Sequence, residues 1–232
     1  MITDWKNKRV AVLGLGVEGV SSVRFLIKNG ARVTVLDKKK EEELRSICHA
    51  EFISAYNSLP GNGQEILNQV QNDTKHVGSL GYKDIKIVGG ENYLKNLPEF
   101  DVVVRTPGVK RNLPELIAAE KNGSIITSQT KIFFDLCPCP IIGVTGTKGK
   151  GTTSTLIYEM LKKRGFDAYL GGNIGQPPFD FLDKLNPQSI VVLELSSFQL
   201  QDLTKSPHIA VVLMITSEHL DYHKDVYEYV EA

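Results

Sequence analysis

The residues best suited to chemistry lie in a glycine-rich segment, GVTGTKGKGTT, which runs from Gly143 to Thr153. A short apolar run precedes the segment and a helical pattern follows it. In such a strand–loop–helix turn the backbone N–H groups cradle phosphates, and a lysine, here Lys150, neutralises the β and γ oxygens. The segment therefore predicts an ATP-binding phosphate loop made of Gly146, Thr147, Lys148, Gly149, Lys150, Gly151, Thr152 and Thr153.

A nucleotide bound by this loop would need Mg²⁺, and the sequence leaves the hydroxyl ligand of the metal open. A serine or threonine usually follows the lysine directly and binds the ion. Here Gly151 follows Lys150, and hydroxyl groups come only at Thr152 and Thr153. We expect one of these two threonines to bind Mg²⁺.

Two later segments place metal-binding side chains after apolar runs. Glu194 follows residues 190–193, and a carboxylate at the carboxyl end of a parallel strand can hold Mg²⁺ in the ligand crevice. His219 follows a second apolar run, residues 209–215, which we expect to be a strand. A metal or phosphate contact is expected of His219 there, and Asp221 can orient it. His219 and His223 also have the spacing of zinc ligands on a helix, but no third ligand is apparent.

A second glycine motif lies near the start of the chain, where Gly14, Gly16 and Gly19 follow the apolar run of residues 9–13. These glycines allow a tight turn and let backbone N–H groups approach a diphosphate at the positive end of the next helix. A second strand is expected over residues 32–36, and Asp37 at its end would hydrogen-bond a ribose or a base edge. The motif predicts a nucleotide-type ligand without naming the nucleotide.

The elements around both motifs indicate an α/β fold with parallel sheets, because strand and helix patterns succeed one another as βαβ units. The prolines of Cys137-Pro-Cys-Pro140 break the pattern and place a domain boundary there. We expect a Rossmann-like parallel-sheet domain over residues 1–137 and an incomplete P-loop α/β ATPase domain over residues 138–232. Residues 54–81 are rich in Asn, Gln and Gly without a sustained period, and we expect an insertion there, with a short surface helix as the alternative.

Composition and charge exclude several classes of protein. The 232 residues hold 27 Lys+Arg against 27 Asp+Glu, so no basic excess points to nucleic acid or to an anionic membrane surface. Apolar runs fall far short of the roughly 20 residues of a membrane helix, and no secretory signal pattern is visible. Three cysteines without zinc-type spacing fit a reducing compartment. We expect a cytoplasmic protein that binds neither nucleic acid nor membranes.

Together the motifs resemble those of the Mur ligases, the ATP-dependent amide-forming enzymes of peptidoglycan synthesis, and within them the D-glutamate-adding (MurD) type. The most specific string is LELSSFQL, from Leu193 to Leu200. The resemblance covers nearly the whole chain apart from residues 54–81. The other segments that carry it are Gly14–Gly19 with Asp37, Thr106–Gly108, Gly146–Lys150, Gly172–Gly175 and Thr216–Asp221.

The resemblance implies an ADP-forming ligation of D-glutamate to UDP-N-acetylmuramoyl-L-alanine through an acyl phosphate, with ATP and Mg²⁺, in cell wall biogenesis. It also implies that the first domain binds the UDP part of the substrate rather than NAD. Lys150 would hold ATP, and Glu194 and His219 would complete the catalytic set. The implied metal ligands are Thr152, Glu194 and His219. The implied substrate-binding residues are Gly14, Val17, Glu18, Gly19, Asp37, Lys38, Thr106, Pro107, Gly108, Asn173 and Ser196.

The chain departs from that family in two ways. Gly151 replaces the expected hydroxyl residue, although the related folate polyglutamylating ligases also carry Gly-Lys-Gly before theirs. The family's carbamoylated lysine has no match, since Lys224 lies too close to His219, and the C-terminal amino-acid-binding domain is absent. We therefore expect a C-terminally truncated chain without ligase turnover by itself.

Three other functions stay open at this point. The first is a non-catalytic module that binds a UDP-sugar or ATP. The second is another acid–amino acid ligase of the superfamily, of the MurC or folate type, against which Phe198-Gln199-Leu200 argues. The third is an NAD-dependent oxidoreductase, which leaves the phosphate loop and the residues around Glu194 and His219 without a role.

Overall fold

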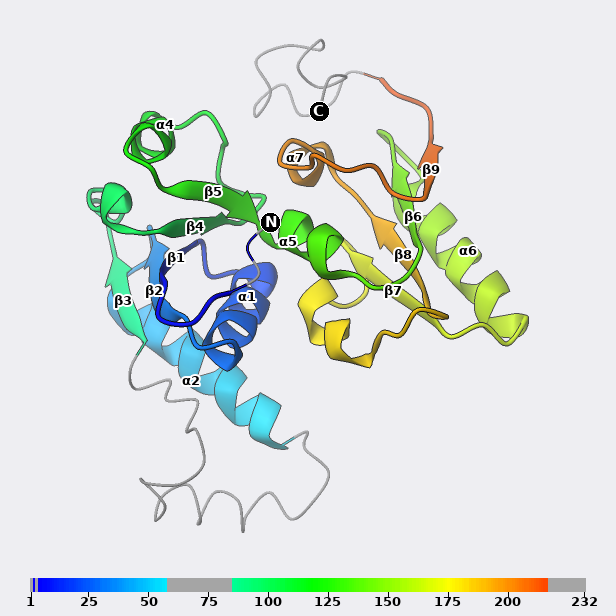
Figure 1. Ribbon diagram of the computed structural model, residues 1–232, viewed down its shortest axis with the longest axis horizontal. Coiled ribbons are helices and arrows are strands. Elements are labelled where there is room, and N and C mark those ends of the chain that lie inside the picture. Colours follow the sequence, from blue (N-terminus) through cyan, green and yellow to red (C-terminus); the bar gives the residue numbers. More distant parts are fainter. Residues whose placement is uncertain (1, 3, 58–84, 217–232) are drawn as a thin grey trace.

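The computed structural model describes residue 2, residues 4–57 and residues 85–216. Two parallel β-sheets lie side by side with helices against them, and residues 137–140 connect one sheet to the other (Figure 1). The α/β class with parallel sheets, as predicted from the strand and helix patterns, is confirmed. None of the helices among the described residues is both long and apolar enough to cross a membrane.

The first sheet has five parallel strands in the order β3-β2-β1-β4-β5. The strand order reverses between β1 and β4, and open α/β sheets bind ligands at such a switch point. The strands are β1 (Arg9–Leu13), β2 (Arg32–Asp37), β3 (Lys86–Gly89), β4 (Val102–Arg105) and β5 (Ile125–Ser128). Its helices are α1 (Val17–Lys28), α2 (Glu41–Asn57), α4 (Pro114–Lys121) and α5 (Gln129–Leu136), with a 3-10 helix η2 (Leu97–Glu99).

Helix α1 shows how the local sequence sets an element that positions a site. Val20, Val23 and Leu26 recur every three residues, and all three are buried against the sheet. The helix ends at Lys28, and Gly30 takes φ +81°, a conformation that favours glycine after a helix. At its other end α1 begins at Val17, directly after the glycine turn that follows β1, and its buried face holds this end against the sheet.

The second sheet has four parallel strands in the order β7-β8-β6-β9. They are β6 (Ile141–Thr145), β7 (Ala168–Gly172), β8 (Ile190–Glu194) and β9 (Ile209–Val212). Strand β9 is shorter than the apolar run 209–215 suggested, because ladder pairing ends at Val212. The remaining elements are α6 (Lys150–Lys163), α7 (Ser197–Leu200) and two 3-10 helices, η3 (Pro178–Asp180) and η4 (Leu182–Lys184).

One hydrophobic core extends from the first sheet into the second. Phe25 of α1 stacks on Phe179 of η3 with ring centroids 4.0 Å apart, and Phe133 of α5 meets Phe181 edge-on at 5.7 Å. Such aromatic pairs add about 0.5–1.5 kcal/mol beyond the area they bury. This apolar contact joins the two halves of the chain.

The insertion expected over residues 54–81 falls only in part on described residues. Residues 54–57 form the last turn of α2 rather than a loop. The rest of the expected insertion lies outside the described residues, so the two alternatives for it stay predictions.

Candidate functional site

The turn between β1 and α1 is built from glycines that leave little room for side chains. Gly14 has φ +94°, and a Cβ there would lie 2.3 Å from Thr106 Oγ1. A Cβ on Gly19 would lie 2.1 Å from the Gly14 carbonyl oxygen, so Gly19 lets α1 pack closely on the turn. A Cβ on Gly16, in contrast, would meet no described atom within 4 Å. Packing therefore does not require Gly16, whereas close approach of a ligand to the backbone would.

Asp37, at the carboxyl end of β2, braces the same turn. Its Oδ2 accepts a hydrogen bond from Leu15 N at 2.7 Å, and its Oδ1 accepts one from Lys39 N at 3.0 Å. Only 9% of the residue is exposed. The carboxylate thus ties together the loops that follow β1 and β2, while its expected contact with a ribose or base stays a prediction.

A cleft of about 460 Å³ opens beside this turn, at the carboxyl edge of the first sheet. The residues singled out from the sequence that line it are Gly14, Gly16, Asp37, Lys38, Thr106 and Gly108. Val17 and Glu18 are not among the lining residues; Val17 is 74% exposed, and Glu18 contacts the second sheet's side of the molecule. Four further lining residues belong to no motif that the sequence shows; they are Tyr93, Val109, Lys110 and Leu113.

A second hollow, of about 520 Å³, lies at the opposite edge of the first sheet. Its lining includes Arg9, Arg32 and Lys86, which are the first residues of β1, β2 and β3. Ligands of open α/β sheets bind outside the carboxyl ends of the strands. We therefore assign the candidate nucleotide site to the cleft at the glycine turn.

The phosphate loop connects β6 to α6 and has the conformation that its glycines permit. Gly146 and Gly149 take φ values of +130° and +86°, and α6 begins at Lys150 directly after Gly149. Lys150 Nζ donates to the carbonyl oxygens of Gly146 at 2.8 Å and Thr147 at 3.1 Å. The lysine side chain therefore folds back over its own loop, at the positive end of the α6 dipole.

Glu194 lies beside the start of α6, as its position at the end of β8 predicts. It is 4% exposed, and its Oε1 accepts a hydrogen bond from Asn173 Nδ2 at 3.0 Å. A Cβ on Gly151 would lie 3.2 Å from Glu194 Oε2, so the glycine after Lys150 faces this carboxylate. The structure thus brings together Lys150 and Gly151 at the start of α6, Asn173 directly after β7 and Glu194 at the end of β8.

These groups fit a magnesium ion that is shared with a nucleotide. Mg²⁺ prefers oxygen ligands and is commonly held by one or two carboxylates together with substrate phosphates. Glu194 supplies a buried carboxylate next to the phosphate loop. Among the described residues no group of three or more His, Cys, Asp or Glu side chains is placed to hold a metal. His219, Asp221, His223 and Lys224 lie outside the described residues, so their expected roles stay predictions.

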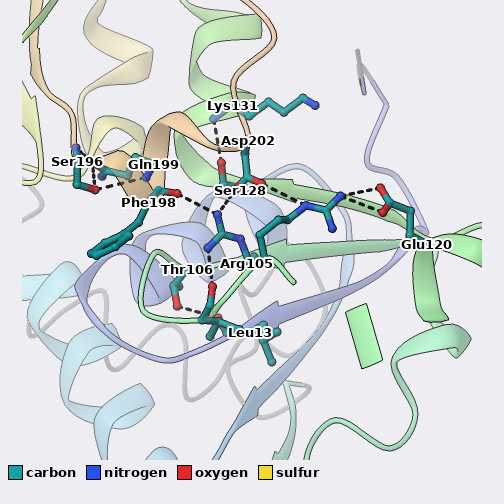
Figure 2. A network of polar contacts seen from close by, with 12 residues as sticks. Leu13, Arg105, Thr106, Glu120, Ser128, Lys131, Ser196, Phe198, Gln199 and Asp202 are labelled. Carbon is teal, nitrogen blue, oxygen red and sulfur yellow. Dashed lines mark hydrogen bonds and ion pairs between the residues drawn. The ribbon is translucent and has the colours of Figure 1, made fainter. Parts of the chain in front are cut away.

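Polar contacts join the loops of the two sheets around α7 (Figure 2). Arg105, at the end of β4, donates from Nη2 to Asp202 Oδ2 at 2.6 Å and to the Phe198 carbonyl oxygen at 3.0 Å. The Arg105 and Asp202 side chains are 0% and 3% exposed. Arg111 Nε lies 3.6 Å from the other oxygen of Asp202. Neither Arg105 nor Asp202 was singled out from the sequence, because neither is part of a recognisable site motif.

Glu18 and Ser196, both expected to bind substrate, take part in a second link at α7. Glu18 Oε1 accepts a hydrogen bond from Gln199 Nε2 at 2.6 Å. Gln199 Oε1 in turn accepts from Ser196 N at 3.0 Å and forms with it the capping box of α7. Burial raises the pKa of Glu18 to about 7, although the hydrogen bond from Gln199 and the charge of Arg105 act in the opposite direction. The substrate contacts expected of Glu18 and Ser196 stay predictions.

Comparison with known proteins matches both halves of the chain to one family. Residues 8–59 match the Mur ligase MurD-like N-terminal domain, and residues 144–232 match the Mur ligase middle domain. The chain is 42% identical over 227 residues to the UDP-N-acetylmuramoylalanine–D-glutamate ligase of Acetivibrio thermocellus. It is 40% identical over 229 residues to the corresponding ligase of Ruminiclostridium cellulolyticum. These alignments take in 98% and 99% of this chain but 42% and 43% of the relatives' lengths.

Solved structures give more distant matches. A UDP-N-acetylmuramate:L-alanyl-gamma-D-glutamyl-meso-diaminopimelate ligase from Neisseria meningitides is 20% identical, with a TM-score of 0.48 and coverage of 95% of this chain and 64% of the other. A UDP-N-acetylmuramate–alanine ligase from Thermotoga maritima is 19% identical, with a TM-score of 0.47 and coverage of 97% and 46%. From the sequence matches along both halves, the chain belongs to the Mur ligase family.

Proposed function

We propose that this chain provides the two nucleotide-binding units of an ADP-forming ligase that joins D-glutamate to UDP-N-acetylmuramoyl-L-alanine in peptidoglycan synthesis. The observation that carries the proposal is the phosphate loop, in which Lys150 and the buried Glu194 carboxylate lie at the start of α6. Identity of 40–42% to ligases of that name supports the choice of substrates. An enzyme that consumes ATP and a nucleotide-linked precursor is expected in the cytoplasm.

We further propose that residues 1–137 bind the UDP part of the substrate in the cleft at the glycine turn. The open space at Gly16 and the cleft lining of Lys38, Thr106 and Gly108 support this assignment. Residues 138–232 would bind ATP. NAD is disfavoured as the ligand because an oxidoreductase has no use for the phosphate loop.

In the proposed reaction the alanine carboxylate attacks the γ-phosphate of ATP, ADP leaves, and the amine of D-glutamate then displaces phosphate from the acyl phosphate. Lys150 would stabilise charge that develops on the phosphoryl oxygens, and the loop N–H groups would hold them in place. Asn173 orients the Glu194 carboxylate through its 3.0 Å hydrogen bond. When bound there, Mg²⁺ would neutralise the β and γ oxygens, with Glu194, a threonine of 152 or 153, and His219 as its proposed ligands.

Calorimetric titration of the purified chain tests the proposal. We expect saturable binding of UDP-N-acetylmuramoyl-L-alanine and of a non-hydrolysable Mg·ATP analogue, and none of NADH. Gly16→Ala serves as the matched control for the first ligand and Lys150→Ala for the second, since each changes one site. Binding of NADH alone would overturn the assignment of the first unit, and a chain that is folded by circular dichroism but binds no ATP analogue would overturn that of the second.

A further inference from the structure

Among the described residues, the contacts that join the first sheet's half of the chain to the second sheet's half include two separate sets. One is the contact of α1 with η3, where Phe25 stacks on Phe179 and Ser21 Oγ donates to Asp180 Oδ1 at 2.7 Å. The other lies at the carboxyl ends of the strands, where the α7 segment meets Glu18 in the first turn of α1 and Arg105 at the end of β4. Figure 2 shows the Arg105 side of it. We call this second set the α7 clamp; its members are Glu18, Arg105, Phe198, Gln199 and Asp202.

The first arm of the α7 clamp begins in the glycine turn of the proposed UDP site. Glu18 is the charged residue of the stretch Gly14–Gly19. Its carboxylate does not line the cleft but binds Gln199 Nε2 at 2.6 Å, across 181 positions of sequence. Gln199 closes the capping box of α7, whose N-cap Ser196 lies two residues after Glu194. A continuous path of hydrogen bonds therefore leads from the start of α1 through Gln199 to Ser196, two residues after the proposed metal ligand Glu194.

The second arm begins at the other wall of the same cleft. Arg105 directly precedes Thr106, a cleft residue whose hydroxyl donates to the Leu13 carbonyl oxygen at 2.8 Å. The guanidinium of Arg105 holds both the Phe198 carbonyl, inside α7, and the Asp202 carboxylate, beyond it. The two arms thus contact α7 from the first turn of α1 and from the end of β4, each next to a loop that lines the cleft.

We propose that Glu18, Arg105 and Asp202 are positioning residues, which hold the UDP cleft of the first sheet in a fixed orientation to the phosphate loop of the second. The inference rests on the proposed function, since only a reaction between ligands on different sheets needs that orientation. Phosphoryl transfer depends almost wholly on positioning, and a misplacement of about 1 Å costs about 100-fold in rate. The contact of α1 with η3 keeps the two halves together without the clamp, so loss of the clamp loosens orientation rather than unfolding the chain.

Spin-label distance measurements test the proposal directly. Labels at Lys121→Cys and Lys163→Cys, both exposed, report the spacing of the two sheets in a Cys137→Ser background that lacks the half-buried native thiol. For the double variant Glu18→Ala with Asp202→Asn we expect a distance distribution about twofold wider than for the unmodified chain, because domains without a tight contact move relative to each other. If circular dichroism shows that the double variant is unfolded, Glu18→Ala alone is the reporter, with the same expectation.

Two matched variants serve as controls. Glu18→Gln, the control for Glu18→Ala, keeps an oxygen that can accept from Gln199. We expect its distance distribution to be as narrow as that of the unmodified chain. Lys28→Ala removes an exposed ion pair to Asp183 that also bridges the two halves but lies outside the clamp, and we expect no change. A folded double variant with an unchanged distribution would overturn the role of the clamp, as would equal broadening in Lys28→Ala.

Titrations on the same variants separate failure of this inference from failure of the proposed function. UDP-N-acetylmuramoyl-L-alanine and the Mg·ATP analogue should each bind the single variant Asp202→Asn with unchanged affinity, because Asp202 does not line the cleft and we assign each site to a single sheet. The double variant then shows whether Glu18 touches the UDP ligand. A selective loss of UDP-ligand affinity would mean that Glu18 is a direct ligand contact, and would overturn its positioning role. If neither ligand binds to the unmodified chain, that result would instead overturn the proposed function.

Discussion

The buried carboxyl group of Glu18 should make the stability of the chain depend on pH in a predictable direction. Burial raises the pKa of Glu18 from 4.5 to about 7 in the folded chain. Between these two values the folded state binds more protons than the unfolded state, so stability falls as pH rises. The contribution is fully present below pH 4.5 and is lost as pH passes through 7. One pKa unit corresponds to about 1.4 kcal/mol, so the loss between pH 5 and pH 8 amounts to about 2–3 kcal/mol.

The assay is urea unfolding of the unmodified chain and of Glu18→Gln at several pH values from 5 to 8. Glutamine keeps the shape and an acceptor for Gln199 but does not titrate, while every other acid and base of the chain is common to both proteins. The free energy of unfolding of Glu18→Gln should therefore gain on that of the unmodified chain by about 2–3 kcal/mol over this range. With a slope of about 2 kcal/mol per molar urea, the relative shift in midpoint is about 1 M.

Parallel pH profiles for the two proteins would refute this reasoning, because they would mean that Glu18 is ionised in the folded chain as readily as in water. A difference that grows toward low pH would refute it as well. That result would show that the Gln199 hydrogen bond and the charge of Arg105, which lower the pKa of Glu18, outweigh the burial that raises it.

Other expected outcomes concern the two glycine loops. Lys150→Ala should weaken binding of the Mg·ATP analogue about 10- to 100-fold in calorimetry, the value of a charged hydrogen-bonding group, and leave the UDP ligand unaffected. Gly19→Ala should lower the free energy of unfolding by about 2 kcal/mol or more, since its Cβ would overlap backbone 2.1 Å away. Gly16→Ala, with open space at its Cβ, should melt like the unmodified chain but bind the UDP ligand more weakly. Gly151→Ser places a hydroxyl near Glu194, and calorimetry should show that the ATP analogue binds about threefold to tenfold more tightly in the presence of Mg²⁺.

Local sequence patterns were sufficient where an element is a buried strand with glycine at its end. The strands expected at residues 9–13 and 32–36 are found at Arg9–Leu13 and Arg32–Asp37. Each is a run of β-branched and aliphatic residues covered on both faces, and a glycine turn follows β1 directly. At β9 the same reasoning overestimates the strand by three residues, because an apolar run does not distinguish a paired edge strand from the extended chain that follows it.

The site was predictable where its parts are contiguous and unpredictable where distant residues meet. The phosphate loop is a local motif, and the position of Glu194 follows from its place at a strand end. The partners of Asp37 and Glu18 do not follow from spacing. Asp37 holds backbone N–H groups of two loops, and Glu18 reaches Gln199 across 181 positions. Both carboxylates lie where a ligand contact is expected. Only the folded structure shows that protein groups already donate hydrogen bonds to them.

The Arg105–Asp202 pair fits a role in orientation better than a role in stability. Withdrawing each charge from water costs several kcal/mol, and an apolar pair of equal size is often as stable or more so. Stacked rings such as Phe25 and Phe179, 4.0 Å apart at the other end of the joint, are less directional than hydrogen bonds to a charged group. A guanidinium meets its acceptors only in a narrow range of directions, and Arg105 has two acceptors around α7, the Asp202 carboxylate and the Phe198 carbonyl. The apolar contact therefore holds the halves together, and the buried ion pair selects one orientation among those that the apolar contact allows.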